Sequence, residues 1–151
     1  MNLPSNPAPD ATPGSPPLSE PDLPNPAEQF SDREIALATS FRESVAPQWT
    51  VAAGQFVFDP DGRVNKPSPF QTGVYFVLNY PYFVTLMGGL ENFRAELIWL
   101  PTWTQARRLA IAAGLSPQQI VTGCLNESTI KKGSEREKLY ELIAEHFGLQ
   151  T

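Results

Sequence analysis

The chain has 151 residues, of which 41% are hydrophobic and 11% aromatic, and this is enough apolar material for one domain with a sizeable core. Its formal net charge is −5, but four acids before residue 31 have no basic residue among them, and the 12 acids and 11 bases that follow nearly cancel. This balance excludes a general attraction to nucleic acid or to an anionic membrane, and no apolar stretch approaches the roughly 20 residues of a membrane span.

Proline dominates the first thirty residues, which hold nine of the sixteen prolines and almost no large apolar side chain. Such a segment cannot bury enough surface to offset the entropy that it would lose on ordering. We therefore predict a disordered, acidic tail over residues 1–30 and a single α+β domain over residues 31–149. The tail can act as a spacer or as a polyproline ligand. Because it lacks the basic and apolar parts of a secretory signal, we expect the protein in the cytoplasm.

The predicted domain opens with a helix. Ser31 and Glu34 have the spacing of a capping box, in which two side chains satisfy the free amides of a helix start. The apolar residues that follow recur at three- and four-residue steps as far as Val45, and Pro47 closes the segment. This pattern predicts an amphipathic helix.

Three strands and a short helix are predicted next. Residues 49–58 are rich in strand-forming residues and end in the Asp-Pro-Asp-Gly turn at 59–62, while residues 74–78 are continuously apolar, as in a strand covered on both faces. We expect these two strands to be antiparallel neighbours. Pro81 suits the first turn of a helix over residues 81–87, and residues 96–100 form the predicted third strand.

Three more helices complete the predicted domain. Thr102, Ser116 and Ser134 each begin a capping-box pattern, and Gly114 and Gly133 mark ends or turns. The fold class that results is α+β, with a three-stranded, largely antiparallel sheet, an N-terminal helix and a C-terminal three-helix segment.

The sequence contains no recognisable active site. Its single Cys124 and single His146 lie far apart, and Cys124 shares a helical face with apolar residues, where a thiol is usually inert. Neither a clustered set of metal ligands nor a glycine-rich phosphate loop is present. We therefore predict a protein that is not an enzyme and binds no cofactor or metal, with a Cys124–His146 pair as the enzyme alternative.

A DNA-binding module is the alternative function, because residues 106–126 have the small, turn and apolar positions of a helix-turn-helix. The helix that would read the bases, residues 117–124, contains no Arg or Lys to contact phosphates or guanine. We therefore favour a structural helical hairpin and do not expect a nucleic-acid partner.

Aromatic side chains crowd the middle of the chain, and two pairs of them flank prolines at junctions between predicted elements. Aromatics beside arginine are the usual anchors of protein interfaces, although most aromatics belong to the core. We predict that a partner protein binds at a groove formed by Tyr80, Tyr82, Trp99, Trp103, Arg107 and Arg108.

Three segments carry a resemblance to known proteins: residues 73–80 (GVYFVLNY), 97–108 (LIWLPTWTQARR) and 137–143 (EKLYELI). In these segments the chain resembles small cyanobacterial proteins without enzyme motifs, among them the carboxysome assembly factors of the CcmS type. The resemblance spans residues 31–149 and leaves out the proline-rich tail. It implies an adaptor that binds an extended segment of a carboxysome shell protein.

Overall fold

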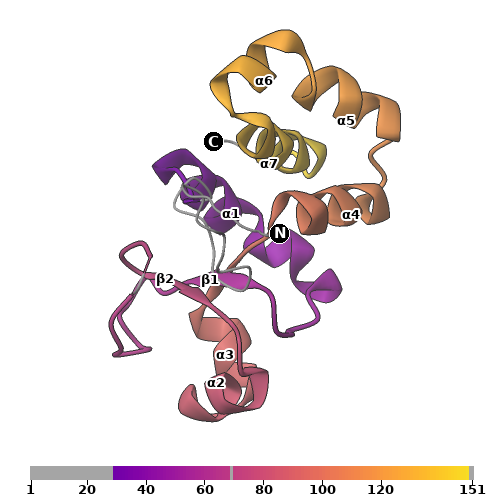
Figure 1. The fold of residues 1–151 in the computed structure, drawn as a ribbon. Helices are drawn as coiled ribbons and strands as arrows, with labels where there is room; N and C mark the ends of the chain where they lie inside the picture. The colour runs from indigo at the N-terminus through magenta and orange to yellow at the C-terminus, as the bar shows by residue number, and fades with distance from the viewer. Residues whose placement is uncertain (1–28, 69, 150–151) are drawn as a thin grey trace, which may run out of the picture.

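The computed structural model describes residues 29–68 and 70–149, so residues 1–28 of the tail predicted over residues 1–30 lie outside the described residues. A small three-stranded sheet and a set of helices pack around one hydrophobic core (Figure 1). The elements follow in the order α1 (Asp32–Val45), the 3-10 helix η4 (Ala46–Gln48), β1 (Phe56–Phe58), β2 (Val74–Phe76), α2 (Tyr80–Leu86), α3 (Leu90–Glu96), β3 (Ile98–Leu100), α4 (Trp103–Ala113), α5 (Pro117–Cys124), α6 (Glu127–Lys132) and α7 (Glu135–His146). The predicted α+β class is confirmed.

The sheet has the order β2-β1-β3, and both pairings are antiparallel, with Val57 opposite Tyr75 on one side and Trp99 on the other. The predicted first strand, residues 49–58, is strand only in its last three residues. The loop before β1 is held instead by the buried side chain of Gln55, which donates to Thr50 O and accepts from Trp49 Nε1. The side-chain amide of Gln55 thus supplies hydrogen bonds here in place of the backbone hydrogen bonds between strands that a longer strand would form.

The strand predicted over residues 74–78 is shorter than expected and lies at a sheet edge, so the expectation of burial on both faces is wrong. Val74 is buried, but Tyr75 and Phe76 are half-buried and Leu78 is exposed. Asn79 then caps α2 by accepting from the amide of Tyr82. Figure 1 shows α2 and α3 together, apart from the layer that α4 to α7 form.

The core is centred on α1 and α7, which pack against each other (Figure 1). Phe41 of α1 and Tyr140 of α7 meet edge to face with ring centroids 5.5 Å apart, and both side chains are fully buried. The Tyr140 hydroxyl donates to Pro101 O. Removal from water raises the pKa of Tyr140 well above its usual value.

Local start and stop signals are confirmed at most helix ends. Ser31, Thr102 and Ser116 each form a complete capping box, and Gly114 ends α4 in a left-handed conformation with φ 118°. Ser134 is the exception, because its side chain caps nothing. Its own amide instead donates to Thr129 O and closes the preceding helix.

That preceding helix, α6, was not predicted, so the C-terminal segment contains four helices rather than three. Asn126 caps it by accepting from the amide of Thr129, and Gly133 ends it in a left-handed conformation. Six residues are too few for the periodic pattern that identifies longer helices. Among the helices of the described residues, none is long and apolar enough to cross a membrane.

Candidate functional site

The structure distributes the six predicted site residues over several surfaces instead of gathering them around one groove. Tyr80 and Tyr82 lie on α2, where Tyr82 is 54% exposed and Tyr80 is half-buried. In Figure 1 this helix is well separated from α4, which carries three of the remaining residues. Three hollows in the described part of the chain contain Trp99 or Trp103, and neither tyrosine lines any of them.

Trp103 lines a groove of about 820 Å³ between the N-terminal ends of α1, α4 and α7. Phe30, Phe56, Trp103 and Leu125 give the groove its apolar lining. Trp103 is half-buried and Leu125 is 41% exposed, so both offer apolar surface to a ligand. The remaining lining is polar or charged and comes mainly from the turn between α6 and α7. We name this hollow the N-terminal groove.

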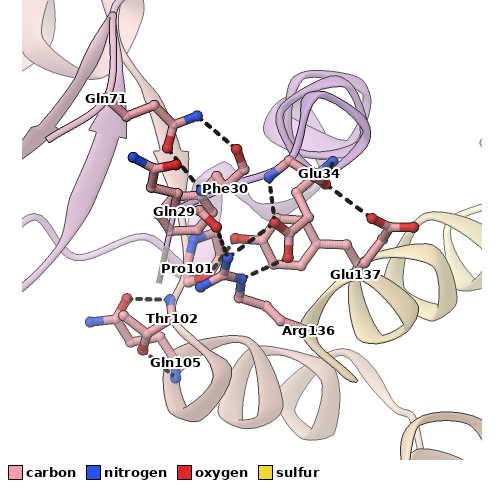
Figure 2. Close-up of polar contacts among 11 residues, drawn as sticks. Gln29, Phe30, Glu34, Gln71, Pro101, Thr102, Gln105, Arg136 and Glu137 are labelled. Carbon is pink, nitrogen blue, oxygen red and sulfur yellow. Dashed lines mark hydrogen bonds and ion pairs between the residues drawn. The ribbon is translucent and has the colours of Figure 1, made fainter. Parts of the chain in front are cut away.

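An ion pair forms one wall of the N-terminal groove (Figure 2). Arg136 holds the Glu34 carboxylate through two hydrogen bonds, Nε to Oε2 at 2.7 Å and Nη2 to Oε1 at 3.0 Å. Arg136 also donates to Gln29 O at 2.8 Å, and its guanidinium stands 4.0 Å from the ring centroid of Phe30. The Glu34 side chain is only 6% exposed. Such a buried, two-point pair gives the groove a fixed geometry.

Phe30 is buried in the core although the sequence analysis assigned it to the tail. Gln71 holds its main chain from both sides, because the Gln71 amide accepts from Phe30 N at 2.8 Å and donates to Phe30 O at 2.6 Å (Figure 2). Phe30 occupies the position before the Ser31 cap, where an apolar residue often packs against the fourth helical residue. That staple pattern was the signal in the sequence that could have placed Phe30 in the domain.

A second hollow, of about 250 Å³, lies between η4 and α4 and brings together two of the predicted residues, Trp99 and Arg108. Its other lining residues are Gln48, Gln105, Leu109 and Ala112. We name it the Trp99 cleft. Trp99 is 8% exposed and stacks on Trp49 with an interplanar angle of 5° and centroids 5.9 Å apart. Arg107, one position before Arg108, is exposed and lines neither this cleft nor the N-terminal groove.

On its other side, Trp99 lines a third hollow of about 400 Å³ that contains Arg42 and Arg94. Both arginines serve main-chain carbonyls: Arg42 donates to Ala95 O at 2.9 Å, and Arg94 donates to Trp49 O and also stacks over the Trp49 ring. The sequence analysis did not single out these residues, because their partners lie about fifty positions away. Their contacts indicate a structural role.

The structure removes the Cys124–His146 pair as a nucleophilic site. Cys124 is fully buried, and its removal from water raises the thiol pKa to about 11, so the thiol stays protonated near neutral pH. Nε2 of His146 lies 2.7 Å from Ala113 O. Within the part of the chain that the structure describes, no group of three or more His, Cys, Asp or Glu side chains could hold a metal ion.

Gly114 lies between α4 and α5, and both of these helices pack against α7. The exposed side chains of α5 include Gln118, Gln119 and Thr122, all of them uncharged.

In comparisons with known proteins, no family model, no curated protein and no solved structure matches the chain.

Proposed function

We propose that the protein is a non-enzymatic adaptor or assembly factor that binds an extended segment of a partner protein in the N-terminal groove. The observation that carries this proposal is the groove itself, about 820 Å³ in volume, with Trp103 and Leu125 presenting apolar surface. A groove of this size accommodates several side chains of a peptide.

The composition of the groove favours a peptide. Interfaces between proteins combine an apolar centre with a polar rim, and tryptophan is the residue type most enriched among their energetic anchors. Here Trp103 and Leu125 supply the centre, while Lys132 and Glu135 belong to the polar lining. Phe56 of the central strand β1 also lines the groove, and this position beside the sheet supports the proposal.

For the partner, we propose a segment of a carboxysome shell protein, and for the location the cytoplasm. Support for this partner is the resemblance of residues 73–80, 97–108 and 137–143 to small cyanobacterial assembly factors. Trp103, the anchor of the groove, lies within the second of these segments.

Affinity capture tests the proposal. The full chain is immobilised and presented with purified carboxysome shell proteins, and bound protein is quantified for Trp103→Ala, Leu125→Glu and the control Tyr82→Ala. An anchoring tryptophan is worth about 2 kcal/mol or more, so Trp103→Ala should weaken capture roughly 30-fold or more. Tyr82→Ala removes an exposed aromatic outside the groove and should leave capture unchanged. Equal capture by all the variants would contradict the proposal.

A further inference from the structure

Trp99, which lines the Trp99 cleft, has a buried hydrogen-bond donor without an acceptor among the described residues. Nε1 of Trp99 is inaccessible and has no hydrogen-bond partner among the described residues. Its stacking neighbour differs, because Nε1 of Trp49 donates to Gln55 Oε1 at 3.0 Å. A buried donor left unpaired costs about 1–3 kcal/mol, and such groups are rare in folded proteins. The cleft is therefore a place where a ligand acceptor would restore a missing hydrogen bond.

The charge around the Trp99 cleft selects the sign of that ligand. Arg108 is the charged residue of the lining, and it forms no ion pair with any residue that the structure describes. Residues 97–126 contain no acid at all, and Arg107 and Arg108 are their charged residues. Arg108 brings a positive charge to the cleft on a chain whose formal net charge is −5, while Glu43 and Glu91 line the neighbouring hollow that shares Trp99. An anionic acceptor therefore fits the cleft, and a cation does not.

We infer that the Trp99 cleft receives the side-chain carboxylate of an Asp or Glu carried by the partner segment, bound by Arg108 and by the indole N–H of Trp99. This inference rests on the proposed function, since the carboxylate belongs to the segment in the N-terminal groove. A planar carboxylate has two oxygens, so it can accept from the Arg108 guanidinium and from a second donor together.

The amide of Gln48 provides a further donor. Gln48 is exposed and forms no hydrogen bond with a described residue. Gln105 is already committed, because its Nε2 donates to Gly54 O at 3.1 Å and its Oε1 accepts from Thr102 N at 3.0 Å. The side chain of Gln105 is thus held in place by its hydrogen bonds, whereas the side chains of Gln48 and Arg108 are exposed. In the complex that we infer, these two side chains rotate so that the carboxylate reaches Trp99 Nε1.

The positions of the two hollows on α4 allow one segment to fill both. Thr104 lines the N-terminal groove and Arg108 lines the Trp99 cleft. Residues four apart lie on one face of a helix, about 6 Å apart along its axis. An extended chain covers that distance in about two residues. We therefore expect the acidic residue two to four positions from the residue that contacts Trp103.

Nuclear magnetic resonance of the indole N–H groups in the full chain tests the carboxylate site directly. The probe is the capped tripeptide acetyl-Gly-Glu-Gly-amide, compared with its Gln counterpart, and Trp99→Phe identifies the Trp99 resonance. We expect a saturable shift of the Trp99 signal by the Glu tripeptide with a Kd of about 1–10 mM, as suits a single ionic contact. The Gln tripeptide should bind at least tenfold more weakly, because it lacks the charge.

Two matched substitutions on α4 localise the effect. Arg108→Gln should weaken binding of the Glu tripeptide about tenfold, a loss within the range for a charge-assisted hydrogen bond. Arg107→Gln removes the same charge one position away, from a residue outside the cleft, and should change the Kd less than twofold. Three results would each overturn the inference: no saturable shift of Trp99, equal shifts with the Glu and Gln tripeptides, or an undiminished shift in Arg108→Gln.

The same variants separate this inference from the proposed function. In the capture assay with shell proteins, Arg108→Gln should reduce capture about tenfold, whereas Trp103→Ala should reduce it further. If Trp103→Ala has no effect while the Glu tripeptide still binds at Trp99, the proposed function fails and the carboxylate site stands. If Trp103→Ala abolishes capture and the tripeptide does not bind, only the carboxylate site fails.

Discussion

Replacing Arg136 with Met should destabilise the domain strongly, because it leaves a charge buried without its partner. Arg136 satisfies both oxygens of Glu34, whose side chain is 6% exposed, while the Arg136 side chain itself is 19% exposed. Breaking a buried pair on one side typically costs about 3–5 kcal/mol. Glu34 keeps its hydrogen bond from Ser31 N at 2.7 Å, which places the expected loss near the lower end of that range.

Two further contacts disappear with the guanidinium. They are the hydrogen bond to Gln29 O and the stacking on the ring of Phe30, and the stacking is worth about 0.5–2 kcal/mol. We therefore expect a loss of about 3–4 kcal/mol for Arg136→Met. Urea denaturation followed by tryptophan fluorescence measures this loss as a lower midpoint at an unchanged slope.

A surface ion pair provides the matched control for this substitution. Lys131 and Glu127 are 3.3 Å apart with side chains 73% and 82% exposed, so Lys131→Met should cost less than about 0.5 kcal/mol. In the double variant Glu34→Gln with Arg136→Met, the buried charge is gone and part of the stability should return. A loss below about 1 kcal/mol for Arg136→Met would refute the reasoning, because the pair would then behave like one at the surface.

Three further predictions concern stability. Phe30→Ala should cost about 3 kcal/mol in urea denaturation, because Phe30 is part of the core, and a cost near zero would place it in the tail. Gly114→Ala should lower the free energy of unfolding by about 1–2 kcal/mol, because Gly114 has a φ of 118° that an alanine adopts only with strain. An unchanged free energy of unfolding would contradict this. Cys124 and Tyr140 both have raised pKa values in the fold, so the unfolded chain loses their protons first as pH rises. The urea midpoint should therefore hold up to about pH 9 and fall above it, and a Cys124→Ala, Tyr140→Phe variant should fall less.

Local signals in the sequence predicted the fold well wherever the structure is decided by near neighbours. The capping boxes at Ser31, Thr102 and Ser116 join atoms three residues apart, and all three form as predicted. Helix α6 escaped prediction because it is short and its cap, Asn126, belongs to no capping box. Ser134 shows the opposite error, because its capping pattern is present while its amide serves the preceding helix.

Contacts between distant residues were beyond the sequence analysis. Phe30 joins the domain through Gln71, 41 positions away, and the Tyr140 hydroxyl finds its acceptor at Pro101, 39 positions away. Neither pairing leaves a local pattern, because each joins segments that only the tertiary fold brings together. The boundary between tail and domain was accordingly placed too late by at least one residue.

The candidate site was predicted in its parts but not in its arrangement. Trp103 lines the N-terminal groove, whereas Trp99 and Arg108 line the separate Trp99 cleft. Tyr80 and Tyr82 lie on α2, away from both hollows. Aromatic clustering along a sequence cannot tell these cases apart, because the element that carries each ring decides which surface the ring joins.

The central claim is that a partner segment lies in the N-terminal groove, and site-specific photo-crosslinking tests it most directly. A benzophenone amino acid is placed at position 125 inside the groove, and at position 82 on α2 as the control, because Leu125 and Tyr82 are both exposed in the protein alone. With a carboxysome shell protein present, we predict a crosslink from position 125 to one contiguous segment of that protein, and none from position 82. A crosslink from position 82 alone would contradict the account, as would the absence of any adduct from position 125 in a complex that still forms.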